Sequence, residues 1–426
     1  MSSSTEVPVK RVVVVGQGYV GLPLAVRVAE AGHRVVGVDV DELRVKRLSS
    51  GESFAEDVTS DRLLRALNSG RYSLSTDYAD AADFDVCIIT VPTPLKDGAP
   101  DLSYVESAVQ GIGEYLKPGA TVILESTTYP CTTEHVVLPI LEACSGLRAG
   151  DDFHLGYSPE RIDPGNRTWR LENTPKVISG VNEESLRHVA EFYDCVVERT
   201  VAVSSPRTAE LTKLLENTFR HVNIALVNEL AMFCKPLGID IWEVIDAAST
   251  KPFGFMRFLP GPGVGGHCLP IDPSYLSWQV KQALRRDFRF VSLANDINSH
   301  MPDHVVLRVA RGLNARRKPV NGSKVLVLGL AYKRNTGDIR ESPSVAVADG
   351  LRQLGAHVLA VEPHVEASRL PVDILCVELT EERLAAADAV VIATDHDAFD
   401  YALVESAADY VFDACNRCRG ADVERL

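Results

Sequence analysis

The sequence predicts an α/β protein with two doubly wound domains that are joined by a long central helix and a helical middle domain. Two observations support this prediction. Short runs of β-branched residues, each followed by a turn and a helical segment, occur in both ends of the 426-residue chain. Between them, about thirty residues keep an uninterrupted helical pattern. We expect domains at residues 1–204, 205–314 and 315–426.

The composition is acidic and otherwise ordinary. The chain has 44 Lys and Arg against 58 Asp and Glu, a net charge of −14, and 46% hydrophobic residues. An acidic surface argues against a nucleic-acid partner, although a local basic pocket could still bind a phosphorylated small molecule. No apolar run approaches the length of a membrane span, and Met1–Val9 lacks the apolar core of a signal peptide. We therefore expect a cytoplasmic enzyme with no membrane partner.

Cysteine use agrees with a reducing compartment. The nine cysteines are odd in number and mostly isolated among apolar residues. Cys415 and Cys418 form one CxxC pair, which cannot complete a four-ligand zinc site. We expect no metal site and an incidental role for this pair.

The first forty residues follow the order strand, glycine turn, helix, strand, acid. Arg11–Val15 is an apolar strand, residues 16–21 read GQGYVG, Leu22–Ala31 is helical, and Arg34–Val38 ends at Asp39. This order is typical of a Rossmann-like dinucleotide site.

Each of the three glycines in this turn is needed for a physical reason. Gly16 permits a tight turn, Gly18 lets the backbone approach a pyrophosphate, and Gly21 lets the helix pack on the strand. Asp39 would accept hydrogen bonds from the ribose hydroxyls and repel a 2′-phosphate, so the sequence favours NAD over NADP. The alternative is a glycine turn that binds no ligand.

Two further strands end at polar turns. Asp85–Val91 and Ala120–Leu124 have strand character, and Thr93 and Thr127 follow them. Ligands of a doubly wound sheet bind beyond the carboxyl ends of its strands. We therefore expect these two threonines near the nicotinamide and its ribose.

The long central helix is predicted from Ser205 to about Pro236. Its length suits a helix that packs between domains or subunits. Four of its polar residues are three or four positions apart and share one face: Lys213, Glu216, Asn217 and Arg220. From spacing alone, an exposed polar stripe is an equally good interpretation.

A glycine-dense loop, residues 260–272, carries Cys268 after two glycines. Glycine lets a ligand approach closely, so we interpret Cys268 as a reactive thiol, with Asp272 placed to orient water or tune the thiol. The alternative is a buried, inert cysteine.

The C-terminal segment repeats the strand and helix order. Lys324–Leu328 leads into a turn at residues 329–333, then a helix at about Ser344–Gly355 and a strand at Val358–Glu362. Ala389–Ala393 and Tyr410–Asp413 resemble later strands, which we expect to complete a second Rossmann-like fold. Because a full GxGxxG is missing here, the sequence suggests a nucleotide other than NAD.

Taken together, these blocks resemble the UDP-glucose/GDP-mannose dehydrogenase family across essentially the whole chain. The matching blocks are GQGYVG at 16–21, PTP at 92–94, ST at 126–127, SPER at 158–161, ExxKxxxN at 210–217, GGHCLPID at 265–272, GLAYK at 329–333 and RESP at 340–343. Arg161-Ile-Asp163 and His267 resemble the branch that oxidises UDP-N-acetylhexosamines. The resemblance implies a four-electron oxidation of a nucleotide-sugar C6 alcohol that consumes two NAD+.

The resemblance also implies residue roles. Cys268 would form the thiohemiacetal and thioester, and Lys213 and Asn217 would steady the oxyanion. The remaining catalytic residues would be Thr127, Glu160 and Asp272. The residues implied for cofactor binding are Gly16, Gly18, Tyr19, Val20, Gly21, Asp39, Arg44, Thr93, Thr127 and Arg340. Those implied for substrate binding are Glu160, Arg161, Ile162, Lys213, Asn217, Arg220, Gly265 and Lys333.

Several alternatives stay open. UDP-glucose or dTDP-glucose would also suit the motifs, and the roles of Asp163 and Arg257 are unassigned. A two-electron dehydrogenase of the 6-phosphogluconate or hydroxyacid type shares the NAD fold but lacks the block around Cys268. A non-catalytic nucleotide-sugar sensor would not need Lys213, Asn217, Cys268 and Asp272 together. We expect a homodimer or a higher homo-oligomer.

Overall fold

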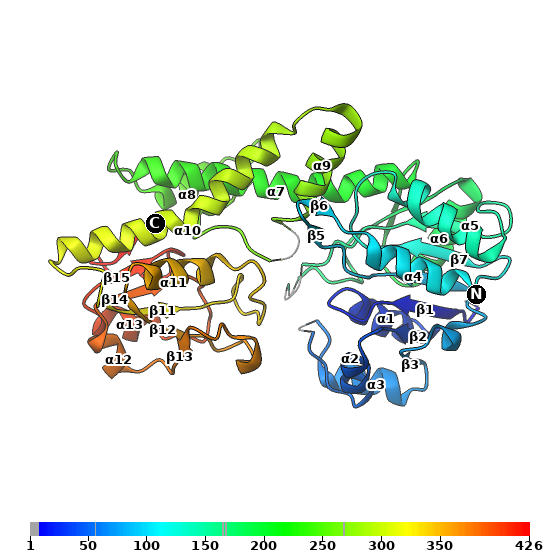
Figure 1. Ribbon diagram of the computed structural model, residues 1–426, viewed down its shortest axis with the longest axis horizontal. Coiled ribbons are helices and arrows are strands. Elements are labelled where there is room, and N and C mark those ends of the chain that lie inside the picture. The colour runs from blue at the N-terminus through cyan, green and yellow to red at the C-terminus, as the bar shows by residue number, and fades with distance from the viewer. Residues whose placement is uncertain (1–7, 56, 164–165, 167, 267–268) are drawn as a thin grey trace. The chain divides into compact units, whose positions relative to one another are not determined.

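The computed structural model describes residues 8–55, 57–163, 166, 168–266 and 269–426. The chain divides into two compact units, residues 1–216 and residues 217–426. Helix α7 (Pro206–Cys234) begins in the first unit and continues into the second (Figure 1).

The first unit is built on an eight-stranded sheet in the order β10-β9-β8-β7-β4-β1-β2-β3. Six strands are parallel neighbours in the doubly wound order 3-2-1-4-5-6: β1 (Arg11–Val15), β2 (Arg34–Val38), β3 (Tyr72–Ser75), β4 (Val86–Ile89), β7 (Thr121–Leu124) and β8 (His154–Tyr157). β9 (Lys176–Gly180) pairs antiparallel with β8, and β10 (Thr200–Ala202) pairs parallel with β9.

Helices cover this sheet because its central strands are apolar on both faces. The four residues of β4 and the four of β7 are all buried, as a parallel sheet between two helical layers requires. The covering helices are α1 (Gly21–Glu30), α2 (Glu42–Ser49), α3 (Ser60–Asn68), α4 (Ser103–Gly113), α5 (Leu138–Ser145) and α6 (Glu183–Tyr193). A short hairpin, β5 (Leu95–Lys96) with β6 (Ala99–Pro100), extends the loop after β4.

The second unit contains a six-stranded parallel sheet in the order β13-β12-β11-β14-β15-β16, the same doubly wound order. Its strands are β11 (Lys324–Leu328), β12 (His357–Val361), β13 (Leu375–Cys376), β14 (Ala389–Ile392), β15 (Val411–Asp413) and β16 (Glu424–Arg425). The intervening helices are α11 (Pro343–Gln353), α12 (Glu381–Ala386) and α13 (Tyr401–Ala407).

Three helices precede this sheet: α8 (Ile241–Ser249), α9 (Asp272–Leu284) and α10 (Arg289–Ala315). Apolar residues of α7, α8, α10 and α11 share one core with the sheet, and this core includes Trp242, Met301, Val327 and Leu351. Helices α8 and α10 and the C-terminal part of α7 are therefore packed directly on one face of the sheet.

The predicted fold class, two Rossmann-like domains with a helical middle, is confirmed. The helix predicted from Ser205 to Pro236 is present as α7. The predicted three-domain boundaries stay predictions. No helix in the described part of the chain combines the length and apolar character needed to cross a bilayer.

Candidate active site

The glycine turn after β1 is closely packed at two of its glycines. Gly16 has φ +89°, and an added Cβ there would lie 2.9 Å from the Thr90 carbonyl oxygen. An added Cβ on Gly21 would lie 1.8 Å from the Gly16 oxygen. Gly18 differs, because nothing lies within 4 Å of its Cβ position. Backbone therefore faces open space beside the N-terminus of α1, and a pyrophosphate fits this arrangement.

Asp39 stands at the end of β2 and connects this turn to α2. Its carboxylate accepts a hydrogen bond from the Gln17 backbone N–H at 2.7 Å and one from the Asp41 N–H at 3.0 Å. Arg44 Nη1 donates to Asp39 Oδ2 at 2.9 Å, and its guanidinium lies over the Phe54 ring. The cation is offset by two carboxylates, since Arg44 also lies 3.5 Å from Asp41. Because both carboxylates neutralise Arg44, little positive charge is left to bind the 2′-phosphate of NADP.

The loops after β4 and β7 are joined by side-chain hydrogen bonds. Thr93 Oγ1 donates to the Thr127 carbonyl oxygen at 2.8 Å, and Ser126 Oγ donates to the Val91 oxygen at 2.7 Å. Thr93 and Thr127 therefore lie together at the carboxyl edge of the sheet, where a bound nucleotide is expected.

The loop after β8 is fixed both within itself and to α7. Glu160 Oε1 accepts a hydrogen bond from the Ile162 backbone N–H. Arg161 forms a bidentate pair with Glu216 of α7, at 2.7 and 3.3 Å, and donates to the Pro175 oxygen. Bidentate guanidinium–carboxylate pairs define both position and orientation.

Glu210 attaches α7 to the loop after β7. Its fully buried carboxylate accepts hydrogen bonds from the Cys131 N–H at 2.6 Å, the Thr133 N–H at 2.9 Å and the Thr133 hydroxyl at 2.7 Å. Burial raises the pKa of this carboxyl, and these bonds oppose the shift. Glu210 belongs to the ExxKxxxN block, but no role was predicted for it from the sequence. The sequence feature that could have indicated a role is a glutamate on the buried face of the helix, one turn before Lys213.

Lys213 and Asn217 follow on the same buried side of α7, one turn apart, whereas Arg220 is exposed. In the second unit, Asn217 Nδ2 donates to Asp272 Oδ2 at 2.6 Å, and both side chains are buried. Asp272 is the first residue of α9. The structure thus brings Asn217 and Asp272 together, while Cys268 and His267 lie outside the described residues.

The glycine loop packs on the segment after β11. An added Cβ on Gly265 would lie 2.6 Å from the Glu341 oxygen, and the Gly266 N–H donates to the Arg340 oxygen at 2.9 Å. Gly266 has φ +82° and faces the Tyr332 ring. The block that ends at Asp272 and the segment that carries Lys333 and Arg340 are therefore neighbours in the fold.

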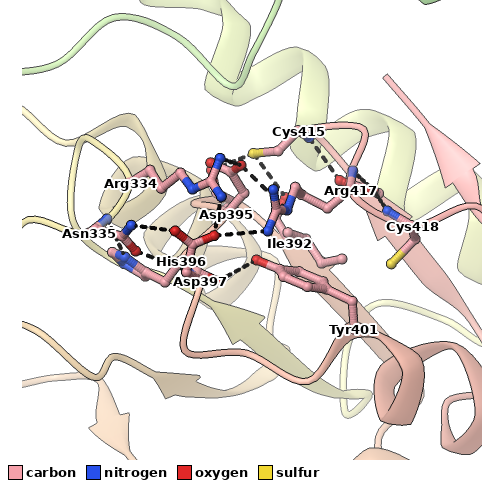
Figure 2. Close-up of polar contacts among 12 residues, drawn as sticks. Arg334, Asn335, Ile392, Asp395, His396, Asp397, Tyr401, Cys415, Arg417 and Cys418 are labelled. Atoms are coloured by element: carbon pink, nitrogen blue, oxygen red, sulfur yellow. Dashed lines mark hydrogen bonds and ion pairs between the residues drawn. The ribbon is translucent and has the colours of Figure 1, made fainter. Parts of the chain in front are cut away.

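Ion pairs clamp the loop after β11 to the loop after β14 (Figure 2). Asp397 pairs with Arg334 and, at 3.1 Å, with Arg417, and Asn335 Nδ2 donates to it at 2.7 Å. Asp395 lies 3.7 Å from each of the two guanidinium groups. The contacts with Arg334 and Asn335 lower the pKa of Asp397 to about 2.

The second glycine turn differs from the first. Glu362 ends β12 as Asp39 ends β2, but it accepts hydrogen bonds from the Leu330 and Ala331 N–H groups and pairs with His396 at 3.1 Å. Ala331 is fully buried in the position that corresponds to Gly18. The backbone of this turn is therefore less open than the backbone at Gly18. This difference agrees with the expectation that the second sheet binds a nucleotide other than NAD.

The CxxC pair surrounds a carboxylate. Asp413 accepts hydrogen bonds from the backbone N–H groups of Cys415, Arg417 and Cys418. Burial raises the pKa of both thiols, that of Cys418 to about 12. Neither thiol is therefore suited to nucleophilic chemistry near neutral pH.

An open glycine turn and an acid at the end of the second strand define an NAD-binding α/β protein, in which a second doubly wound sheet follows the first along the chain. Comparison with known proteins extends this conclusion. Three models of the UDP-glucose/GDP-mannose dehydrogenase family match the chain: the NAD binding domain at residues 10–197, the central domain at 207–300 and the UDP binding domain at 326–419.

Full-length relatives are similar in sequence and structure. A UDP-N-acetyl-D-mannosamine dehydrogenase of Pyrococcus horikoshii is 37% identical over 91% of this chain and 90% of its own. A UDP-N-acetyl-D-glucosamine 6-dehydrogenase of Pseudomonas aeruginosa is 37% identical over 91% of each chain. A solved UDP-D-ManNAc dehydrogenase structure from P. horikoshii has a TM-score of 0.88 and 34% identity, covering 98% of this chain and 99% of that one.

The chain belongs to the UDP-glucose/GDP-mannose dehydrogenase family. It is an NAD-dependent nucleotide-sugar 6-dehydrogenase, as the motifs predicted.

Asp39 should determine the choice of cofactor. We expect the wild-type enzyme to prefer NAD+, and Asp39→Asn to lower kcat/KM for NAD+ by about 10–100-fold, because a charged hydrogen-bond acceptor for the ribose is lost. The same change should reduce the ratio of kcat/KM for NAD+ to kcat/KM for NADP+. The measurement is kcat/KM with each cofactor. Asp77→Asn, which changes an exposed helix cap, is the control. Wild-type turnover that is equally efficient with NADP+ would contradict this role.

Proposed function

We propose that the protein oxidises the C6 hydroxyl of a UDP-N-acetylhexosamine to a carboxylate in two successive oxidations through a covalent intermediate on Cys268. The two curated relatives described above carry names of UDP-N-acetylhexosamine dehydrogenases, which supports this substrate class. The Arg161-Ile-Asp163 sequence supports the same branch.

One observation carries the covalent route. The described residues on both sides of Cys268 are fixed, Gly266 by its backbone hydrogen bond to Arg340 and Asp272 by its hydrogen bond to Asn217. A nucleophile must be held close to the reacting carbon, and these two anchors flank Cys268 in the sequence. Lys213 lies one helical turn from the Asn217 anchor.

The residues that would hold NAD are those of the first glycine turn and the adjacent strand ends. The open backbone at Gly18 would receive the pyrophosphate, Asp39 and Arg44 would lie at the adenosine ribose, and Thr93 and Thr127 at the nicotinamide end. Tyr19, Val20 and Arg340 complete this set. When bound, NAD+ supplies the hydride acceptor for each oxidation.

Cys268 would retain the aldehyde made by the first oxidation. Its thiolate adds to the aldehyde carbon, and the thiohemiacetal carbon can lose a second hydride to give a thioester. The Lys213 ammonium and the Asn217 amide would stabilise the negative oxygen of the tetrahedral states. The aldehyde would then remain on the enzyme between the two oxidations.

Water would release the product. Thr127 and Asp272 would position the water and relay its proton, and Glu160 would act as the carboxylate of the hydrolytic step. Water attacks the thioester carbon, the carbon–sulfur bond breaks, and the Cys268 thiolate is restored. Substrate contacts would come from Glu160, Lys213 and Asn217 and from five further residues: Arg161, Ile162, Arg220, Gly265 and Lys333.

A substrate panel tests the proposed specificity. Purified enzyme with NAD+ should form uronic acid fastest from a UDP-N-acetylhexosamine, with UDP-glucose and dTDP-glucose at least about tenfold lower in kcat/KM, because a site that hydrogen-bonds an acetamido group discriminates against sugars that lack it. NADH absorbance and product mass are the readouts. Preference for UDP-glucose would refute the N-acetylhexosamine assignment, and binding without turnover of any sugar would indicate a sensor.

Cys268→Ser should stop turnover and preserve binding. Serine forms an alkoxide far less readily than cysteine forms a thiolate, so kcat should fall by about a thousandfold or more, while nucleotide-sugar affinity changes by less than about threefold. Steady-state kinetics and calorimetric titration measure the two quantities. Cys234→Ser, at a buried cysteine of α7, is the matched control. Near-normal kcat in Cys268→Ser would end the thioester proposal.

We also propose a homodimer formed through α7. Phe219, Leu226, Leu230 and Phe233 recur on one face of this helix and are 41–55% exposed. An apolar face of this kind suits a second copy of the chain. The cytoplasmic location remains a prediction.

Leu226→Glu should weaken this dimer, because a carboxylate would be buried at the contact. Light scattering at micromolar protein should show a dimer for wild type and a shift toward monomer for the variant. Leu354→Glu changes a leucine of similar exposure elsewhere and should stay dimeric. A monomeric wild-type protein would rule out the interface.

A further inference from the structure

A buried ion pair lies beneath the carboxyl edge of the first sheet. Lys176 Nζ is 3.0 Å from Glu125 Oε2, and the two side chains are 3% and 0% exposed. Glu125 directly follows β7, and Lys176 is the first residue of β9. Burying two charges is unfavourable unless their geometry is good and their remaining hydrogen bonds are satisfied.

The remaining bonds of this pair involve two loops. Lys176 Nζ also donates to the Pro159 carbonyl oxygen at 3.2 Å. The Tyr193 hydroxyl donates to Glu125 Oε1, and the Lys176 ammonium lies 5.3 Å from the centre of the Tyr193 ring. One ammonium group is therefore shared between the loop after β7 and the loop after β8.

Each of these loops carries a residue assigned above to product release. Thr127 is two positions after Glu125, and Glu160 is one position after Pro159. Glu160 is buried, and its Oε2 has no hydrogen-bond partner among the described residues, so its position depends on the backbone that carries it. Burial raises the pKa of the Glu125 carboxyl, Lys176 opposes that shift and Glu160 adds to it, which indicates that the two carboxyl groups interact.

We propose that Lys176 is a positioning residue for the hydrolytic step. Its ammonium fixes the loop that carries Thr127 relative to the loop that carries Glu160, and it balances the Glu125 charge behind them. The proposal rests on the proposed function for the roles of Thr127 and Glu160. A hydrophobic side chain would fill the same volume without linking the two loops.

Lys176→Met tests the link, because it removes the ammonium and keeps most of the volume. We expect kcat to fall by about 10–100-fold, as misplaced reacting groups do, while KM for NAD+ changes by less than about threefold. Thioester-bound sugar should accumulate and be visible as added mass on enzyme quenched during turnover. Lys176→Arg keeps a cation and should recover part of the rate.

A second variant separates the effect of Lys176 on loop position from its effect on the buried charge of Glu125. Lys176→Met leaves Glu125 buried without its cation and can therefore reduce folding. Lys176→Met with Glu125→Gln removes both charges, so it should fold with a Tm near that of wild type and still have low kcat. Arg308→Met breaks an ion pair with Glu424 in the second unit, whose side chains are 6% and 23% exposed, and its kcat per folded molecule should stay within about threefold of wild type.

The outcomes are distinguishable. Wild-type kcat and no covalent sugar in the folded double variant would overturn the proposal, because the pair would then serve only charge balance. If the wild-type enzyme itself forms no covalent sugar and one NADH per sugar, the proposed function fails instead. If wild type shows covalent sugar and Lys176→Met accumulates no more of it, the proposed function stands and only the positioning role is lost.

Discussion

The constraint on which the structure depends is that backbone N–H groups of buried strand-end loops need acceptors. In the described residues, carboxylates meet this need at several turns. Asp39 accepts from the turn after β1, Glu210 from the loop after β7, Glu362 from the turn after β11, and Asp413 from the loop after β15. A carboxylate accepts several bonds at once and holds them more strongly than a neutral acceptor does. Each of these four loops is thereby fixed without regular secondary structure.

A carboxylate follows the second strand of each doubly wound sheet, but the glycine turns that the two carboxylates hold differ in how open they are. Asp39 holds the first turn from one side, and the backbone at Gly18 stays open. Glu362 is enclosed by backbone N–H groups and His396, and Ala331 fills the corresponding position. Strand order alone would assign both sheets the same ligand. The two turns differ at one position, Gly18 in the first and Ala331 in the second, and in the buried His396. This difference agrees with the match of the first sheet to an NAD binding domain and of the second to a UDP binding domain.

Much of this fold could be predicted because its signals are local. β-Branched runs such as Arg11–Val15 and the long apolar pattern of α7 identify strands and a helix without tertiary information. The antiparallel pairing of β9 could not be predicted, since residues 176–180 have the same apolar character in either direction. The Lys176–Glu125 pair was missed for a related reason. Lys and Glu are almost always exposed, and only the fold shows that these two are buried together.

The central claim is that one active site carries out two oxidations on one sugar. Complete conversion of a limiting amount of UDP-N-acetylhexosamine in excess NAD+, with NADH counted against sugar consumed, tests it most directly. Two NADH per sugar, a carboxylate product and no aldehyde captured by a carbonyl reagent are the predicted result. One NADH per sugar, with an aldehyde or ketone as the only product, would contradict the account.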